Sequence, residues 1–396
     1  MMCLASWLAC PAWGAGSIVY LAENGDDQAT GASRSEALRT IHQAVAVAKA
    51  VVTDGQVTVC VSPGVYTMAD PVVIDAPIHV RGEGAQVEDV VFRNTGKASW
   101  NSPDHRVFKL NHPQAWVSHA VLENGHTDGP GFGVLISEQG GMVSNCVVRG
   151  HIGSSHQTSM PQGAVCLSGD AAILTHSVVS NCVVRECDAL WINDDRYRPV
   201  GGVGVEKGRV ENCLVADCGV AGSNTIYPAI TGGIQAKGGS VVNCTVVRCK
   251  GSHVGGIKTF SGTRVVNCVS FDNKLLKAVR EFIDNPDGSV TTNRFADAVS
   301  VSPWAGDGAL FENCAGDAAV LSGSQRCRDS VSASDFRDYA HGNLVPAAKG
   351  ILMNAGVTPS GWAGLIDLAG KPRVKGRSID IGCYEGNPSG LSIRFR

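Results

Sequence analysis

Three short apolar segments carry acidic and basic residues at matching positions, where such groups could act on an anionic substrate. They are residues 202–206, 233–237 and 256–260, which read Gly-Val-Gly-Val-Glu, Gly-Ile-Gln-Ala-Lys and Gly-Ile-Lys-Thr-Phe. Side chains alternate between the two faces of a strand, so an inward apolar residue after each Gly leaves the polar residues facing outward. The outward polar residues are Glu206, Gln235, Lys237 and Lys258. We expect them to form a cationic strip with an acidic flank on neighbouring strands.

Loops of unequal length precede these strands and carry further reactive groups. The loops span residues 149–163, 185–201, 217–232 and 249–255. Their reactive groups are His151 and His156 in the first, Asp194, Asp195, Arg196 and Arg198 in the second, Tyr227 in the third and His253 in the last. Insertions in a repeat protein cluster on one face, which is often the binding face. The loops and the strip are therefore expected to form one site.

Two reactions on a polysaccharide fit these residue types. A β-elimination needs a cation to neutralise a uronate carboxylate, a base to remove the adjacent proton and a proton for the leaving oxygen. The candidates to neutralise are Lys237, Lys258, Arg196 and Arg198, and the candidates for base or acid are His253 and Tyr227. Hydrolysis needs two carboxyl groups about 5 to 9.5 Å apart. The local candidates for that pair are Asp194, Asp195 and Glu206.

We place the lyase ahead of the hydrolase. The catalytic candidates are then Lys258, His253, Lys237 and Arg196. The substrate-binding candidates are Asp194, Asp195, Arg198, Tyr227, Glu206 and Gln235.

The same groups also have structural explanations. Lys and Glu on neighbouring strands commonly form a solvated pair, and Asp194-Asp195 with Arg196 and Arg198 could tie a loop tip by ion pairs. The face could equally belong to a non-catalytic surface or adhesion module that binds glycans. The two Asp residues suit Ca²⁺, but no Asp-rich loop of recognised spacing is present. We expect no cofactor, with Ca²⁺ as the alternative.

A recurring phrase indicates what positions these residues. Asn-Cys, preceded by an apolar residue and one further residue, occurs at Asn145, Asn181, Asn212, Asn243, Asn267 and Asn313. The phrase lies in short β-branched segments with no helical period between them, which excludes βαβ crossovers and predicts two or three short strands per unit. Such units must coil, with each strand parallel to its counterpart about 4.8 Å away. Like residues then stack, so the Asn column is expected to form an amide ladder.

The cysteines of this phrase are expected to pack in the interior, because a thiol is a small hydrophobic group. A second set, Cys187, Cys218 and Cys249, falls five residues after its partner in three consecutive units. Stacked residues are within disulfide reach, so one bridge is possible there. A reduced stack is the expectation.

These repeats resemble those of a known group. Residues 232–246 and 255–269 each read Gly-Gly-Ile, then Gly, then Val-Val-Asn-Cys. The start at Ile18-Val-Tyr-Leu-Ala with Pro63-Gly64, and the end at Gly370-Lys-Pro-Arg373 with Asp380-Ile-Gly-Cys-Tyr-Glu385, fit the same pattern. Over roughly residues 17–386 the chain resembles exported bacterial right-handed parallel β-helix proteins of the pectin-lyase-like group. That group includes lyases, hydrolases and epimerases, so the resemblance implies the fold more than an activity.

The expected fold is therefore all-β, a right-handed parallel β-helix with an N-terminal capping helix and an irregular C-terminal cap. We divide the chain into a signal peptide at 1–15, a lead-in and cap at 16–102, repeats at 103–316 and a C-terminal capping region at 317–396. The helix is predicted over 33–52, from a capping-box pattern at Ser33 and Glu36 and an apolar stripe. Residues 271–305 break the repeat and are read as an arm over the groove or a transition out of the coil.

Composition limits the partners. Charged residues make up 17% of the chain and the net charge is −3, which gives no general attraction to nucleic acid. The first fifteen residues are apolar and end in Pro-Ala-Trp-Gly-Ala, which favours a secreted, periplasmic or cell-surface protein. No later stretch of 18 apolar residues is present, so no membrane span is expected. The expected partner is a polysaccharide, and an acidic polysaccharide is the narrower expectation.

Overall fold

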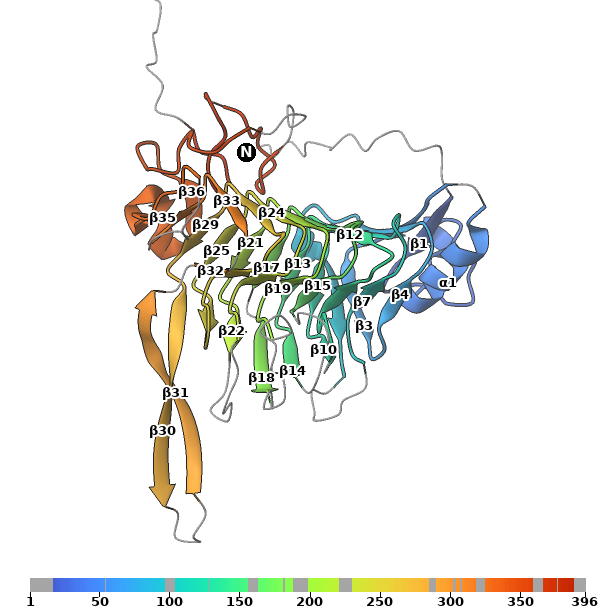
Figure 1. The fold of residues 1–396 in the computed structure, drawn as a ribbon. Helices are drawn as coiled ribbons and strands as arrows, with labels where there is room; N and C mark the ends of the chain where they lie inside the picture. The colour runs from blue at the N-terminus through green and yellow to red at the C-terminus, as the bar shows by residue number, and fades with distance from the viewer. Residues whose placement is uncertain are drawn as a thin grey trace, which may run out of the picture.

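The chain forms a coil of short strands in a computed structural model (Figure 1). The structure describes residues 17–53, 55–96, 104–127, 129–155, 163–180, 182–187, 199–220, 230–284, 290–301, 304–306, 308–317, 325–358, 366–375 and 377–387. The coil has four long sheets, here called A, B, C and D, and strand numbers advance by four along the middle of each. Each middle coil therefore has four strands and not the two or three predicted.

Sheet C carries the predicted site and has eight strands. They are β4 (Val72–Ile74), β7 (Phe108–Leu110), β11 (Val134–Ile136), β15 (Val165–Leu167), β19 (Val203–Val205), β23 (Ile234–Ala236), β27 (Ile257–Thr259) and β32 (Trp304–Gly306). Each described pair is parallel, and Val165, Val203, Ile234 and Ile257 lie in register on successive strands. The Gly-led strands are therefore confirmed.

Sheet A follows sheet C along each coil and has ten strands. They are β1 (Ile18–Leu21), β2 (Val57–Val61), β5 (Ile78–Gly82), β8 (Trp116–Ser118), β12 (Gly141–Ser144), β16 (Ala172–Thr175), β20 (Arg209–Glu211), β24 (Ser240–Val242), β28 (Arg264–Val266) and β33 (Leu310–Glu312).

Sheet B comes next and has nine strands. They are β3 (Gly64–Met68), β6 (Val90–Asn94), β9 (Val121–Glu123), β13 (Val147–Arg149), β17 (Val178–Ser180), β21 (Leu214–Ala216), β25 (Thr245–Val247), β29 (Val269–Phe271) and β34 (Ala315–Gly316). One inward side chain per strand, such as Val179, Val215 or Val246, joins the central core, which is built from the inward residues of sheets A, B and C.

Sheet D closes each coil and has seven strands. They are β10 (His126–Thr127), β14 (Ile152–Ser155), β18 (Val183–Cys187), β22 (Gly219–Val220), β26 (Lys250–Gly251), β30 (Lys274–Asp284) and β31 (Val290–Val301). The last two pair antiparallel as a long hairpin that reaches away from the body of the coil (Figure 1). Residues 271–305, for which an arm over the groove or a transition out of the coil was predicted, thus contain a projecting hairpin, and a position over the groove stays a prediction.

The Asn ladder lies in the turn between sheets A and B. Asn212, Asn243 and Asn267 all adopt positive φ, near 50°. Asn243 Nδ2 donates to Asn212 Oδ1 at 3.2 Å, and Asn267 Nδ2 donates to Asn243 Oδ1 at 3.0 Å. A left-handed turn residue costs least for Asn or Gly, and the amide also satisfies its neighbour. The predicted ladder is confirmed at these three coils.

One of the six Asn-Cys phrases occupies a different turn, so the prediction of a single column is wrong there. Cys182 follows β17 of sheet B and precedes β18 of sheet D, and the turn between sheets A and B in that coil is His176-Ser177, with φ 45° at His176. Asn181 lies outside the described residues. Both turns need a left-handed residue followed by a small inward one, as Asp217-Cys218 also illustrates. The same Asn-Cys sequence therefore fits either the turn between sheets A and B or the turn between sheets B and D.

The second cysteine column consists of Cys182, Cys218 and Cys249. Val183 pairs with Gly219 and Gly219 with Lys250, which sets the three preceding cysteines in register. The prediction of Cys187 in this column is wrong, since Cys187 lies opposite Ser155 inside sheet D. Cys182, Cys218 and Cys249 are buried free thiols.

The capping helix is α1 (Ile41–Val51), and it starts later than predicted. Thr40, not Ser33, is its N-cap and accepts from the Gln43 backbone N–H at 3.3 Å. Residues Arg34–Glu36 form a separate 3-10 turn without a side-chain cap. The predicted stripe of Ile41, Ala44, Val45 and Ala48 is buried in the core, so the helix covers the end of the coil as expected.

The C-terminal region packs on a flank of the coil. Its apolar residues Val331, Phe336 and Leu352 form a second core with outward residues of sheet B such as Val247 and Phe271. The region includes η5 (Ala333–Asp335), η6 (Tyr339–His341) and the antiparallel pair β35 (Phe336–Asp338) and β36 (Asn343–Pro346). The remaining 3-10 turn, η2 (Val87–Asp89), lies near the start of the coil.

Candidate functional site

The outer face of sheet C aligns the predicted polar residues. Cys166, Gly204, Gln235 and Lys258 are direct neighbours on β15, β19, β23 and β27. The residues on either side of Gln235, Ile234 and Ala236, belong to the central core. Strand alternation therefore points Gln235 and Lys258 away from the core, as predicted.

These outward side chains are nevertheless buried. Lys258 is 4% exposed, and Gln235 and Cys166 are 0% exposed. A solvent-facing sheet surface would leave a lysine mostly accessible, because Lys is almost never fully buried unless it is paired. The outer face of sheet C is therefore covered at this point and is not an open surface.

Lys237 and Glu206 form a direct ion pair across neighbouring strands. Lys237 Nζ lies 2.6 Å from Glu206 Oε1, and the two side chains are 17% and 23% exposed. The structural explanation of a cross-strand pair is thus correct in its geometry, but the pair is half-buried and not fully solvated. Its partial burial strengthens the attraction relative to an exposed pair.

One carboxylate oxygen of Glu206 is paired with Lys237, and the other has no hydrogen-bond partner among the described residues. Oε1 accepts from Lys237, whereas Oε2 is buried and has no hydrogen-bond partner among the described residues. A buried carboxylate oxygen without a donor is costly, unless a ligand or water supplies the hydrogen bond. Glu206 therefore offers an acceptor for a hydroxyl group at this site.

The next coil places Lys258 beside polar and aromatic groups. Lys258 Nζ lies 5.1 Å from the centroid of the Phe260 ring, within the range of a cation–π contact. On the preceding strand, Gln235 Oε1 accepts from Thr231 Oγ1 at 3.0 Å. These contacts fix the two outward side chains on adjacent coils.

The loop candidates are only partly described. His253 is exposed, and its backbone N–H donates to Ile230 O at 3.1 Å. The candidates outside the described residues are His156, Asp194, Asp195, Arg196, Arg198 and Tyr227. Convergence of a loop group with Lys258 stays a prediction.

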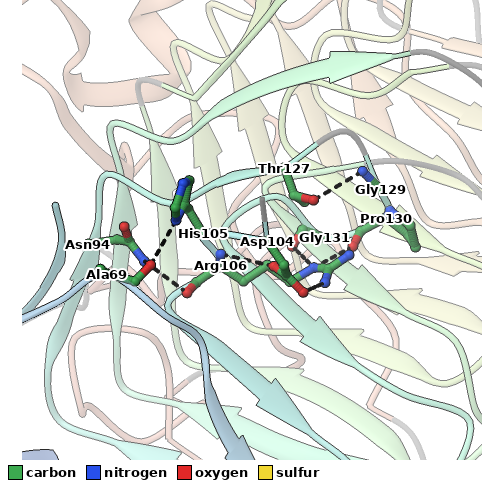
Figure 2. Close-up of polar contacts among 9 residues, drawn as sticks. All are labelled: Ala69, Asn94, Asp104, His105, Arg106, Thr127, Gly129, Pro130 and Gly131. Carbon is green, nitrogen blue, oxygen red and sulfur yellow. Dashed lines mark hydrogen bonds and ion pairs between the residues drawn. The ribbon is translucent and has the colours of Figure 1, made fainter. Parts of the chain in front are cut away.

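A buried arginine that the sequence did not single out lies on an earlier coil. Arg106 pairs with Asp104, and its Nε donates to the carbonyls of Pro130 and Gly131 at 3.0 Å each (Figure 2). Burial lowers the pKa of Arg106 from its usual value, and the Asp104 charge opposes that shift. The hydrogen bonds anchor the guanidinium to the Pro130-Gly131 backbone, so Arg106 organises this loop.

A cavity of about 440 Å³ lies on the turn between sheets B and D, and sequence reasoning missed it. Its lining comes from three successive coils: Arg93, Asn94, Thr95, Gly96, Asn124, Gly125, His126, Gly150 and Ile152. Asn94, one of the lining residues, donates its side-chain amide to the carbonyls of Ala69 and Arg106 (Figure 2). These hydrogen bonds fix its side chain at the wall of the cavity. Glycines at successive turn positions were the available sequence signal, because they leave space where side chains would stand.

A charged ladder borders this cavity. Glu123 accepts from Arg93 Nε at 2.6 Å and from Arg149 Nε at 2.9 Å. Burial alone would raise the pKa of Glu123, but the hydrogen bonds from the two arginines outweigh it and hold the pKa below its usual value. The ladder carries one net positive charge.

His151 has a structural position and no catalytic one. Its Nε2 donates to Leu122 O at 2.9 Å, while Nδ1 accepts from the Gly125 backbone N–H at 2.7 Å. Burial lowers the pKa of His151 to about 4. Both ring nitrogens are therefore satisfied in the neutral ring.

The described ranges contain neither a metal-binding cluster nor a membrane-spanning helix. These residues place no group of three or more His, Cys, Asp or Glu side chains where it could hold a metal ion. Asp194 and Asp195, the calcium candidates, lie outside those ranges. Among the described helices, none has the length and apolar character required to cross a membrane.

Comparisons with known proteins found similar folds. A pectate lyase is 14% identical with a TM-score of 0.46, over 93% of this chain and 96% of that chain. A rhamnogalacturonan lyase is 12% identical with a TM-score of 0.33, over 93% and 100% of the two chains. A pectin methylesterase from Erwinia chrysanthemi is 9% identical with a TM-score of 0.34, over 83% and 98%.

No protein-family model and no curated protein matches the chain. At these identities and TM-scores the structural likeness concerns the fold alone. The sheets of the chain themselves show the fold, which is a parallel β-helix.

Proposed function

We propose that this protein binds an acidic polysaccharide along the outer face of sheet C and cleaves it by β-elimination. The observation that carries the proposal is the enclosed row of outward polar side chains, in which Lys258 is 4% exposed and Gln235 fully buried. Burying polar groups is costly unless hydrogen bonds or ion pairs compensate, and a buried row of such groups that faces away from the hydrophobic core favours a polar binding site. The parallel coil suits a polymer, since equivalent positions repeat along its length.

Lys258, which the sequence predicted as a candidate to neutralise the uronate carboxylate, is proposed here to act as the base in its neutral form. It would remove the proton beside the uronate carboxylate, and the electron pair left on carbon would form the new double bond as the glycosidic C–O bond breaks. The leaving oxygen then takes a proton, for which His253 and Tyr227 are the candidates. The products are an unsaturated uronate and a new reducing end.

The ion pair changes the role proposed for Lys237. Since Glu206 already neutralises its ammonium group, Lys237 is better suited to orient Glu206 than to neutralise a substrate carboxylate. Arg196 and Arg198 remain the candidates to neutralise the substrate carboxylate. Asp194 and Asp195 remain candidates for substrate contact. Glu206 Oε2 and Gln235 are proposed to bind sugar hydroxyl groups.

Glycoside hydrolysis is the second candidate, and one observation favours it. The unpartnered Oε2 of Glu206 is a carboxylate oxygen available to act as base or nucleophile. A second carboxyl group would have to come from Asp194 or Asp195. The third possibility is a glycan-binding module without catalysis.

The site also implies where the protein works. Polysaccharides of this kind lie outside the cytoplasm, and the apolar first fifteen residues have the character of a secretory signal. We therefore propose a secreted, periplasmic or cell-surface location. Detection of the mature chain in culture medium or periplasmic extract, cleaved near residue 15, tests this part.

The reaction is tested by incubating the purified protein with acidic and neutral glycans. Ultraviolet absorbance of the unsaturated uronate and the yield of reducing ends are followed together. Equal growth of both signals supports elimination, reducing ends without absorbance support hydrolysis, and binding without either signal supports the non-catalytic module. Only the first result agrees with the proposal.

A matched pair of variants then tests the base. Lys258→Ala is expected to lose at least a hundredfold in elimination rate, in line with the loss of a general base. Lys349→Ala, an exposed lysine of the C-terminal region, is expected to keep the wild-type rate. Wild-type activity in a folded Lys258→Ala protein would contradict the assignment.

A further inference from the structure

The cysteines at the turn between sheets A and B form a column that ends near the surface. Cys213, Cys244, Cys268 and Cys314 follow one another on successive coils, and each is 0% exposed. Cys327 comes next in the column and is half-buried. Among the described members, the accessible thiol is thus at the C-terminal end.

Backbone pairing places Cys327 directly above Cys314. Glu312 bridges Gln325 and Ala315 bridges Arg328, both in parallel, so the intervening cysteines share one register. Gln325 N–H donates to Phe311 O at 2.9 Å, and Arg328 N–H donates to Cys314 O at 2.9 Å. The segment at 325–328 therefore adds a further rung to the coil.

The two thiols are neighbours on adjacent rungs. Cys314 N–H donates to Cys327 Sγ at 3.3 Å, as Cys244 N–H donates to Cys268 Sγ at 3.5 Å. Parallel neighbours have Cα atoms about 4.8 Å apart, inside the range of about 4.4 to 6.8 Å found for disulfides. Both pairs meet the spacing requirement, but only the outer pair has a thiol that a reagent can reach.

We propose that Cys314 and Cys327 form a disulfide that fastens the C-terminal region to the last full coil. A small-molecule disulfide such as oxidised glutathione is the oxidant. The Cys327 thiolate attacks it and releases one glutathione thiol, and the Cys314 thiolate then attacks Cys327 sulfur and releases the second. Two protein thiols and one glutathione disulfide thus become one protein disulfide and two glutathione thiols.

The bond would hold the C-terminal region against the coil. The C-terminal region packs on sheet B through Val331 and Phe336, and these residues follow Cys327 directly. Fixing residue 327 to residue 314 closes a short loop and limits how far this region can separate from sheet B. Oxidation is therefore expected to raise the temperature at which the region unfolds.

The experiment equilibrates the folded, full-length protein with oxidised and reduced glutathione over a range of ratios. Thiols are then trapped with an alkylating reagent, and peptides are mapped by mass spectrometry. The expected result is a peptide pair joined through Cys314 and Cys327. Cys244 and Cys268 should be recovered as thiols that react only after unfolding.

Three variants sharpen the test. Cys327→Ser should lose the joined peptides and the rise in unfolding temperature, whereas Cys268→Ser should keep both. Cys314→Ser should leave Cys327 carrying glutathione; if it does not fold, Cys327→Ser alone decides. The proposal is overturned if folded wild-type protein keeps Cys327 alkylatable, or retains glutathione on it, at every ratio tested.

Discussion

The ion pair between Lys237 and Glu206 removes one cation from those available to a substrate carboxylate. Its two side chains are 17% and 23% exposed, so each charge depends on the other more than in a solvated pair. Lys258 has a different setting, buried on the next coil beside Phe260. These residues therefore divide into an ion pair that holds a carboxylate in place and a buried lysine that is the proposed base.

Removing Lys237 should expose that dependence. Lys237→Ala leaves the Glu206 carboxylate half-buried without its partner, and we expect a loss of about 1 to 3 kcal/mol in the free energy of unfolding. Lys207→Ala breaks an exposed pair with Asp170 at 3.7 Å and should cost less than about 0.5 kcal/mol. Urea unfolding measures both. Equal losses in the two variants would argue against the half-buried pair.

His151 should make stability depend on pH. The pKa of His151 is about 4 in the folded protein and 6.5 for the free ring. Between these two pH values the unfolded chain therefore binds a proton at His151 that the folded chain does not bind. The stability from burying the neutral ring is full above pH 6.5 and is lost as pH falls toward 4. The loss should reach about 3 kcal/mol.

Urea unfolding across that pH range provides the measurement. A His151→Gln variant, even if less stable at neutral pH, should show a smaller fall. His79, also buried with a pKa near 3, adds to the remaining slope, and the buried Glu385, whose pKa is raised to about 7, opposes it. An unchanged slope in His151→Gln would contradict a neutral buried ring.

The turns between strands explain how the coil keeps its register. Asn212, Asn243 and Asn267 combine a left-handed backbone with amide hydrogen bonds along the coil axis. Much of this was predictable, because a repeated Asn-Cys phrase reports a stacked turn. The misplacement of Cys182 has a physical cause: the turn between sheets B and D has the same conformational need and accepts the same residues. The residue types of a turn therefore do not show which of two turns with the same backbone conformation they occupy.

Two substitutions at Asn243 separate the conformational and hydrogen-bond contributions. Asn243→Ala forfeits both ladder hydrogen bonds and strains a residue at φ 51°, so we expect a loss of about 2 to 3 kcal/mol. Asn243→Gly keeps the left-handed turn and should lose about 1 kcal/mol less. Thermal or urea unfolding compares the two. A glycine variant less stable than the alanine variant would contradict the assigned turn.

Similar reasoning applies to α1. The apolar stripe predicted which residues are buried, but the start was misplaced by several residues, because Ser33 and Glu36 also fit a capping box. In the structure Glu36 instead accepts from Thr30 Oγ1 at 2.7 Å, and Thr40 caps the helix. Long-range packing at the end of the coil decided between two local patterns of similar strength.

For the molecule as a whole, the sequence predicted the site positions better than their surroundings. Strand alternation placed Glu206, Gln235, Lys237 and Lys258 on one face. This prediction needs only the two-residue alternation of side chains along each strand, which is a local property of the sequence. The burial of Lys258 depends on how other parts of the chain cover the face, which no local pattern contains. The cavity beside Arg93 was missed for the same reason: its lining comes from three coils.

The C-terminal region adds a second pH dependence of opposite sign. Asp367, Arg373, Asp380 and Glu385 are all buried there, and burial raises the pKa of Glu385 to about 7 from 4.5. The folded state thus favours the protonated acid, and this contribution is full below pH 4.5 and lost as pH rises through 7. Glu385→Gln should remove that dependence, so its stability relative to wild type should increase from pH 4.5 to 7. A constant difference in urea unfolding across this range would contradict it.

The central claim is that the outer face of sheet C binds an acidic glycan through Lys258. Calorimetric titration of wild type with uronate oligosaccharides first identifies the tightest ligand, which is then titrated into Lys258→Ala and Lys349→Ala. We expect at least tenfold weaker binding to Lys258→Ala and wild-type binding to Lys349→Ala. Wild-type affinity in a folded Lys258→Ala protein would contradict it.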